Sequence, residues 1–145
     1  MKLVTRGEIL RAARAWIGTP YLHQASLRGA GCDCLGLVRG IWRDLYGVEP
    51  ELAPPYTPDW AEARIRETLA EAARRHFDEI APDEVRSGDL LLFRWRTGLP
   101  AKHAGICSGL GRMIHAHDGA VVADVPLGLW HRRISHSFRF PKVTD

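Results

Sequence analysis

A cysteine at the expected start of a helix is the residue best suited to chemistry. Cys34 follows Asp33, and the apolar residues after it recur at spacings of three and four as far as Tyr46, before Gly47. This pattern predicts an amphipathic helix with Asp33 as its N-cap. Unpaired backbone N–H groups and the positive end of the helix dipole at that end favour a thiolate. Cys34 is therefore a candidate nucleophile, the alternative being a small buried apolar residue, which is the usual fate of a free cysteine.

Two histidines are expected to meet across a hairpin later in the chain. If residues 108–110 form a three-residue loop, His103 pairs with His115, and Gly105 pairs with Met113. Directly opposed residues have Cβ atoms about 4.5 to 5.5 Å apart and project from the same face of the sheet. We therefore expect the two imidazoles to be neighbours.

A thiol, a base and an orienting group are the set that cysteine peptidase chemistry requires. Cys34 is assigned as the nucleophile, and His103 as the base that takes its proton and later returns it to the leaving amine. His115 is assigned as the orienting group, because an imidazole can offer an acceptor nitrogen to the N–H of the base. The backbone N–H of Cys34 and the hydroxyl of Tyr21 are expected to stabilise the oxyanion, although Tyr21 could equally pack as an aromatic residue under the loop.

Hydrophobic periodicity predicts helices first and strands second. The expected helices run from a Thr5 cap to Ile17, over 34–46, and from an Asp59 cap to His76 or Phe77; the expected strands are 90–93, 103–107, 112–117, 120–125 and 130–140. The third helix is expected to pack over the core, with a wall or lid of a cleft as its alternative role. The predicted fold class is α+β, with N-terminal helices packed on an antiparallel sheet of about five strands.

The composition is typical of one soluble globular domain, which we expect to span residues 1–145. The net charge is +3, but the arginines are scattered, so no nucleic-acid partner is expected. No stretch is long and apolar enough to predict a membrane span, and the first residues do not resemble a signal peptide, so synthesis in the cytoplasm is expected. The three cysteines do not predict a disulfide framework.

Five separated motifs carry a resemblance that covers almost the whole chain. They are Gly18-Thr19-Pro20-Tyr21, Asp33-Cys34-Leu35-Gly36, Ser87-Gly88-Asp89-Leu90-Leu91-Leu92-Phe93, His103-Ala104-Gly105-Ile106 and Ile114-His115-Ala116. In this order they resemble the successive signatures of the NlpC family of papain-like cysteine peptidases. The resemblance implies a papain-like α+β fold in which the cysteine helix packs on an antiparallel sheet that carries both histidines.

The same resemblance implies a substrate and a setting. Members of the family hydrolyse stem peptides of bacterial cell-wall peptidoglycan, typically at the bond from γ-D-glutamate to diaminopimelate or lysine, and no cofactor or metal is expected. Asp33 matches the family position and is expected to contact a substrate amine as well as to cap the helix. The compact form is similar to members encoded with phage tail genes or gene transfer agents. This implies incorporation into such a particle, with the particle proteins as partners, and action on the cell wall during entry.

Two residues depart from the family pattern. Leu35 stands where the commonest motif has serine, and Ala104 stands where it has valine. The second change is conservative. The first removes a hydroxyl that could help to bind substrate, so stem-peptide recognition is open at this position. Residues 48–86 match no compact member clearly and are expected to shape substrate access.

Two alternative functions remain at this point. Cys32, Cys34, His115 and His117 offer two sulfurs and two nitrogens, a ligand set that zinc accepts, although zinc-binding cysteines are usually two to four residues apart. The other alternative keeps the fold and changes the reaction to acyl transfer, or loses activity so that the domain only binds wall fragments. The intact cysteine and histidine pair argues against loss of activity.

Overall fold

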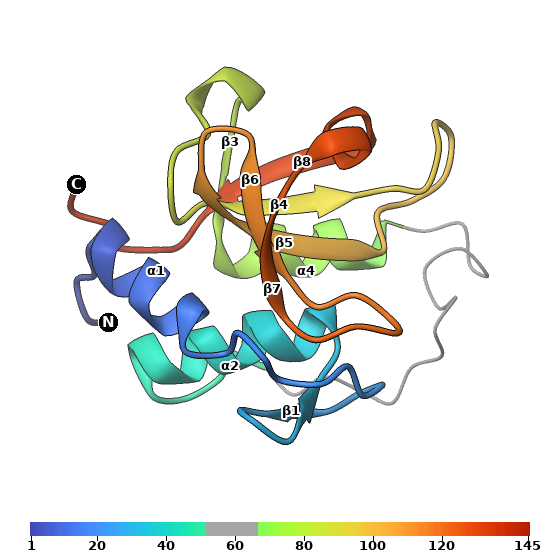
Figure 1. Ribbon diagram of the computed structural model, residues 1–145. Coiled ribbons are helices and arrows are strands. Elements are labelled where there is room, and N and C mark those ends of the chain that lie inside the picture. The colour runs from blue at the N-terminus through green and yellow to red at the C-terminus, as the bar shows by residue number, and fades with distance from the viewer. Residues whose placement is uncertain (52–66) are drawn as a thin grey trace.

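In the computed structural model, which describes residues 1–51 and 67–145, helices precede strands as the sequence predicts. The helices are α1 (Arg6–Arg14), α2 (Cys34–Tyr46) and α4 (Thr68–His76), with the 3-10 helices η1 (Pro82–Glu84) and η2 (Gly128–Arg133). The strands are β1 (Ser26–Leu27), β2 (Gly31–Cys32), β3 (Asp78–Ile80), β4 (Leu90–Phe93), β5 (His103–Gly109), β6 (Arg112–His115), β7 (Ala123–Pro126) and β8 (Ile134–Arg139). Figure 1 shows α1 and α2 side by side below the main sheet. The predicted α+β class is confirmed.

The main sheet has six antiparallel strands in the order β3-β8-β4-β5-β6-β7. Strands β4 to β7 form the predicted meander, and β8 returns to pair with the free side of β4. The sixth strand, β3, was missed because it is only three residues long and none of them is buried, so it has no alternating pattern. A separate two-stranded ribbon, β1 with β2, precedes α2.

The structure differs from the expected bounds of several elements. Helix α1 ends at Arg14 rather than at Ile17, β6 ends at His115 rather than at residue 117, and β7 covers Ala123–Pro126 rather than 120–125. The last strand was expected from Trp130, but residues 128–133 form η2 and β8 begins at Ile134. Gly128 has a positive φ of 53°, and the pairing of β4 with β8 contains an irregularity after Leu92, so the alternating pattern does not continue as strand. The third predicted helix ends at His76 as expected, whereas its expected start at Asp59 lies outside the described residues.

The turn that follows α1 packs closely on α2 through a glycine. A Cβ atom at Gly40 of α2 would lie 2.0 Å from the ring of Trp16, so only glycine allows the indole to rest on this helix. The indole N–H of Trp16 also donates to Asp44, at 3.1 Å. Leu37 and Ile41 on α2 are fully buried in the main core, which lies between the helices and the sheet. This packing holds α2, and with it the candidate nucleophile, in a fixed position.

A buried carboxylate ties the helical part to the sheet. Asp89, at the start of β4, is only 1% exposed and accepts hydrogen bonds from Arg6 of α1 at 3.1 Å and from Arg139 of β8 at 2.9 and 3.0 Å. It also accepts from the backbone N–H of Arg86, across a turn in which Gly88 has a φ of +93°. A buried charge is tolerated when it is paired and hydrogen-bonded in this way. The Ser87-Gly88-Asp89 motif therefore has a structural role.

Another glycine permits close contact between α2 and the loop before it. A Cβ atom on Gly36 would lie 1.8 Å from the carbonyl oxygen of Ala25. The backbone N–H of Gly36 donates to the Asp33 carboxylate, and its carbonyl accepts from the Ser26 hydroxyl. The loop therefore packs directly on the first turn of the helix, which explains the glycine in the Asp33-Cys34-Leu35-Gly36 motif.

Replacing Gly36 with alanine is expected to destabilise the protein, because the added methyl group must displace backbone. We expect a loss of about 1 to 3 kcal/mol in the free energy of unfolding, measured by urea denaturation. Gly7→Ala is the matched control, since Gly7 is exposed on α1 and an added Cβ would approach nothing closer than 3.8 Å. This control should be neutral or slightly stabilising. Equal stability of the two variants would contradict the close packing inferred at Gly36.

Candidate active site

Asp33 positions the cysteine as the sequence predicts. Its carboxylate accepts from the N–H of Gly36 at 2.7 Å, so that α2 begins at Cys34, and from the N–H of Gln24 at 2.8 Å. The residue is only 2% exposed. One buried side chain thus caps the helix and fixes the loop that precedes it. The contact with a substrate amine expected for Asp33 stays a prediction.

The Cys34 thiol lies against the first residues of β5. Its Sγ is 3.9 Å from the carbonyl oxygen of Lys102, the residue before His103. Burial, followed by the charge of Asp33, raises the pKa of Cys34 to about 12, although the backbone N–H groups of Ala104, Leu35 and Cys34 itself act in the opposite direction. The expectation that the helix start yields a thiolate is therefore wrong for the substrate-free site. Here desolvation outweighs the helix terminus.

His103 and His115 form the contact that the sequence predicts, in a buried site. The Nε2 atom of His103 is 2.9 Å from the Nδ1 atom of His115, and the two residues are 5% and 7% exposed. Within the described residues, the Cys34 thiol makes its hydrogen bond with the Lys102 carbonyl rather than with His103. The structure thus brings all three predicted catalytic residues to one end of β5, with the two imidazoles in direct contact.

The register that brings the histidines together differs from the predicted one. Ile106 pairs with Ile114, and the same register continued places His115 beside Gly105 rather than opposite His103. The turn is the two residues 110–111, with a positive φ at Gly111, and the register is irregular before it. The expected three-residue loop is therefore wrong. The register differs by two residues, so both histidines remain on the same face of the sheet.

Gly105 makes the diagonal contact of the two histidines possible. A Cβ atom on Gly105 would lie 3.3 Å from the Cβ atom of His115 and 2.8 Å from the sulfur of Met113. Without that side chain, the His115 ring has space to reach His103. A side chain at this position of the His103-Ala104-Gly105-Ile106 motif would therefore crowd His115 and Met113.

Both imidazoles are held neutral. Burial, followed by the neighbouring His115 and His117, lowers the pKa of His103 well below its usual value. Burial, followed by His117, lowers the pKa of His115 to about 4. At pH 7 the substrate-free site therefore contains a protonated thiol and two neutral rings, with one ring nitrogen donating a proton to the other.

Two tryptophans that sequence reasoning missed cover His103. The ring of Trp130 is stacked on the His103 imidazole with centroids 4.8 Å apart, and that of Trp95 is stacked with centroids 6.1 Å apart. Phe93 lies 5.7 Å from the same imidazole. Trp95 lies in the loop after β4 and Trp130 in η2, and no spacing in the sequence relates them. These rings explain much of the desolvation of His103.

Tyr21 is anchored near Cys34 through its backbone, and its role as a hydrogen-bond donor to the oxyanion stays a prediction. Its backbone N–H donates to the Ala120 carbonyl, and the N–H of Cys32 donates to the Pro20 carbonyl, so the loop is anchored on both sides. Burial, followed by the nearby Cys34, raises the pKa of Tyr21 to about 12. The hydroxyl therefore remains a hydrogen-bond donor at neutral pH, close to the nucleophile.

Residues 1–51 and 67–145 contain neither a metal-binding cluster nor a helix that could span a membrane. In that part of the chain, no group of three or more His, Cys, Asp or Glu side chains is arranged to hold a metal ion. Cys32, one of the four ligands considered, is fully buried in the main core. None of the helices described there has the length and apolar character needed to cross a bilayer.

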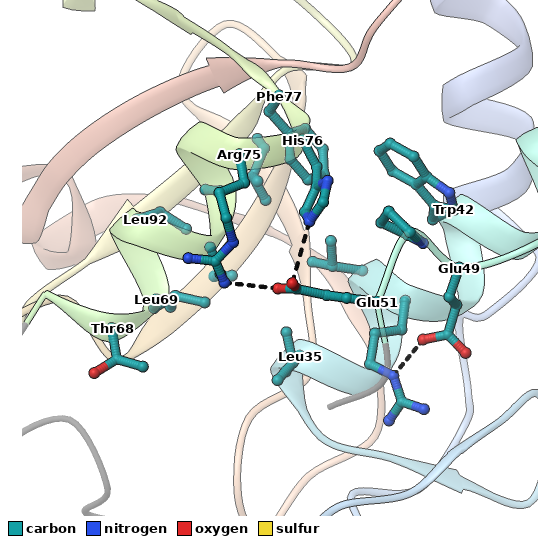
Figure 2. Close-up of a pocket in the computed structure, with 17 residues that line it drawn as sticks. Leu35, Trp42, Glu49, Glu51, Thr68, Leu69, Arg75, His76, Phe77 and Leu92 are labelled. Carbon is teal, nitrogen blue, oxygen red and sulfur yellow. Dashed lines mark hydrogen bonds and ion pairs between the residues drawn. The ribbon is translucent and has the colours of Figure 1, made fainter. Parts of the chain in front are cut away.

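An apolar cavity of about 260 Å³ lies between α2, α4 and the sheet (Figure 2). Its walls come from α2, α4 and the sheet and include Leu35, Val38, Trp42, Leu69, Leu92 and Ala104. Glu51 pairs with Arg75 at 2.7 Å and with His76 at 3.5 Å across it. Helix α4 therefore packs into the core and also forms a wall. The Leu35 side chain, which replaces the family's serine, belongs to this apolar surface.

Comparisons with known proteins identify one family and several relatives. A model of the NlpC/P60 family matches residues 18–139. Gamma-DL-glutamyl hydrolase of Bacillus subtilis (strain 168) is 26% identical over 140 residues, covering 94% of this chain and 30% of that protein. Murein DD-endopeptidase MepS/Murein LD-carboxypeptidase of Escherichia coli (strain K12) is 26% identical over 126 residues, covering 86% of this chain and 57% of that protein. The chain thus spans less than two thirds of either relative.

A solved structure shares the fold. The crystal structure of an NlpC/P60 family protein from Bacillus cereus ATCC 10987 superposes with a TM-score of 0.70 at 19% sequence identity. The superposition covers 96% of this chain and 41% of that one.

Proposed function

Because this chain belongs to the NlpC/P60 family, we propose that it is a cysteine peptidase that hydrolyses stem peptides of bacterial peptidoglycan. The observation that carries the proposal is a thiol at the start of α2, against the end of β5 where His103 contacts His115 at 2.9 Å. The name of one relative, a murein endopeptidase, supports this substrate class, and the name of the other, a gamma-DL-glutamyl hydrolase, supports hydrolysis of a γ-glutamyl bond.

In the proposed reaction, Cys34 attacks the carbonyl carbon of the scissile amide. The Sγ–C bond forms as the thiol proton moves to Nδ1 of His103, and the carbonyl π electrons move to the oxygen. The backbone N–H of Cys34 and the Tyr21 hydroxyl donate hydrogen bonds to that oxyanion. The C–N bond then breaks and the leaving amine takes the proton from His103. Water, deprotonated by the same imidazole, hydrolyses the thioester and regenerates the thiol.

The neutral state of the site decides how this reaction begins. A thiol with a pKa of about 12 beside an imidazole of lowered pKa does not form a stable ion pair, so we propose that the proton moves only as substrate arrives. The thiol must first leave the Lys102 carbonyl, to which it is hydrogen-bonded. In the proposed site, Nε2 of His103 is assigned as the donor to Nδ1 of His115, which lies 2.9 Å away, and this tautomer leaves Nδ1 of His103 as the base.

We propose that the bond cleaved is the one from γ-D-glutamate to the next stem-peptide residue, typically diaminopimelate. Acyl transfer would use the same thioester and differ only in its acceptor, an amine in place of water. Wall binding without turnover would leave the thiol unused. Delivery by a phage tail or gene transfer particle, with particle proteins as partners, stays a prediction that rests on the resemblance of the sequence.

Replacing Cys34 with alanine should abolish turnover, because no other group in the proposed site supplies the nucleophile. We expect a loss of more than about a thousandfold in the rate of stem-peptide cleavage, followed by mass spectrometry of the products. Cys32→Ala is the matched control, since Cys32 lies two residues away and is buried in the core. Retained cleavage by a folded Cys34→Ala protein would refute the assigned nucleophile. Products joined to an added amine would indicate acyl transfer.

His103 and His115 should differ in their importance, because proton transfer contributes more than orientation. His103→Ala is expected to lower kcat by at least about a hundredfold, and His115→Ala by a smaller factor. His115→Gln, whose side-chain oxygen can still accept a hydrogen bond, should retain more activity than His115→Ala. Full activity of both alanine variants would contradict the proposed triad.

A further inference from the structure

A third histidine lies beside the two imidazoles of the proposed site. The ring of His117 is stacked on that of His115, with centroids 5.7 Å apart and an angle of 15° between the planes. It also meets the ring of His103 edge-on, with centroids 5.8 Å apart. His103 and His115 are buried, whereas His117 is exposed. The proposed base and its orienting group therefore have a neighbouring imidazole that solvent can reach.

Trp130 contacts all three of these rings. Its indole is stacked on His103 at 4.8 Å and meets His115 and His117 edge-on, at 5.6 and 5.4 Å. Trp95 lies 6.1 Å from His103 and 6.4 Å from His117. Aromatic packing therefore holds the His117 ring at a defined distance from both buried imidazoles.

The charge of His117 acts on both of its neighbours. Burial is the largest cause of the lowered pKa of His103, followed by the charges of His115 and His117. Burial, followed by His117, lowers the pKa of His115 to about 4. Two charges about 6 Å apart interact appreciably where burial limits screening by water. A proton on His117 therefore disfavours a proton on either buried ring.

The other titratable and charged groups around His117 do not change charge near neutral pH. Asp118 follows it in the chain, and Tyr21, whose pKa is raised by burial to about 12, lies in the loop that is hydrogen-bonded to residue 120. Arg133 and Lys102 lie over indole rings of the same cluster. Aspartate, lysine and arginine ordinarily titrate outside the range of pH 5 to 8. Histidine is the side chain that titrates within it, and His117 is the exposed histidine of this cluster.

We propose that His117 acts through His103 as a positioning residue: when it takes up a proton from solvent, it slows the attack of Cys34 by opposing transfer of the thiol proton to His103. This inference rests on the proposed function. In that reaction a positive charge develops on the His103 ring as it accepts the proton. A cation on His117, 5.8 Å away, opposes that charge, and a neutral His117 does not. Full activity is therefore expected while His117 is neutral, and activity falls as the pH falls and His117 becomes charged.

The test is the pH dependence of kcat/KM for stem-peptide cleavage between pH 5 and 8. The wild type is expected to lose about tenfold in kcat/KM from pH 8 to pH 5, through a single titrating group. His117→Gln, which stays neutral, should keep the rate of the wild type at pH 8 and lose this pH dependence. His117→Lys, which stays charged, should show the reduced rate at every pH. His131→Gln removes an exposed histidine of η2 outside the cluster and should keep the wild-type profile.

A wild-type profile that is flat from pH 5 to 8, or one that is unchanged in His117→Gln, would overturn the proposal. A His117→Lys protein as fast as the wild type at pH 8 would do the same. A loss of rate in His117→Gln that is equal at every pH would indicate a structural role and would also overturn it.

Failure of the proposed function is distinguishable, because the wild type would then cleave no stem peptide. The coupling between the rings is measurable in that case by nitrogen-15 NMR of the histidines without substrate. His117→Gln is expected to raise the pKa of His115 from its value of about 4, because a repelling charge is removed. An unchanged pKa of His115 in this variant would contradict the proposal.

Discussion

The contact between two buried imidazoles is the constraint on which the site depends. The Nε2 atom of His103 and the Nδ1 atom of His115 are 2.9 Å apart. Protonation of either ring is unfavourable near neutral pH, because burial lowers both pKa values. The observed register of β5 and β6 brings the two rings to the same face of the sheet, Gly105 leaves space beside His115, and the Trp130 ring covers His103. The result is a neutral site in which charge develops only during the proposed reaction.

The helical side of the molecule supports this site through hydrogen bonds to one carboxylate. Asp33 binds the N–H groups of Gly36 and Gln24 at once, so the same residue starts α2 and fixes the loop that leads from Tyr21. Gly36 and Gly40 allow that loop and the turn after α1 to approach the helix without displacement of backbone. Packing on both sides of α2 thus fixes the position of the nucleophile. Catalysis requires such fixed positions, because reacting groups must be held in the correct geometry.

The sequence predicted the order of helices and strands and the start of α2, because each rests on local periodicity or capping. The meeting of the two histidines was predicted from a hairpin loop of the wrong length and was correct because only the parity of the two positions decides which face they share. The sequence did not predict η2, since Trp130 and Ile134 share the parity of one strand although only Ile134 lies in β8. The predicted register of the β5–β6 hairpin was wrong by two residues, but both histidines lie on the same face of the sheet, as predicted. The pKa of Cys34 was misjudged because the helix terminus is visible in sequence, whereas the desolvation that opposes it arises from the tertiary structure. The cover of Trp95 and Trp130 over His103 is likewise a long-range feature.

The protonation state of His103 tests this account most directly. Nitrogen-15 NMR of histidine-labelled protein, titrated from pH 8 downwards, reports which ring nitrogen carries a proton. The account predicts a neutral His103 at pH 7, with the proton on Nε2 and a free Nδ1, that stays neutral well below its usual pKa. It also predicts that His115 titrates only near a pKa of about 4. An imidazolium at His103 at pH 7, balanced by a Cys34 thiolate, would contradict the neutral site.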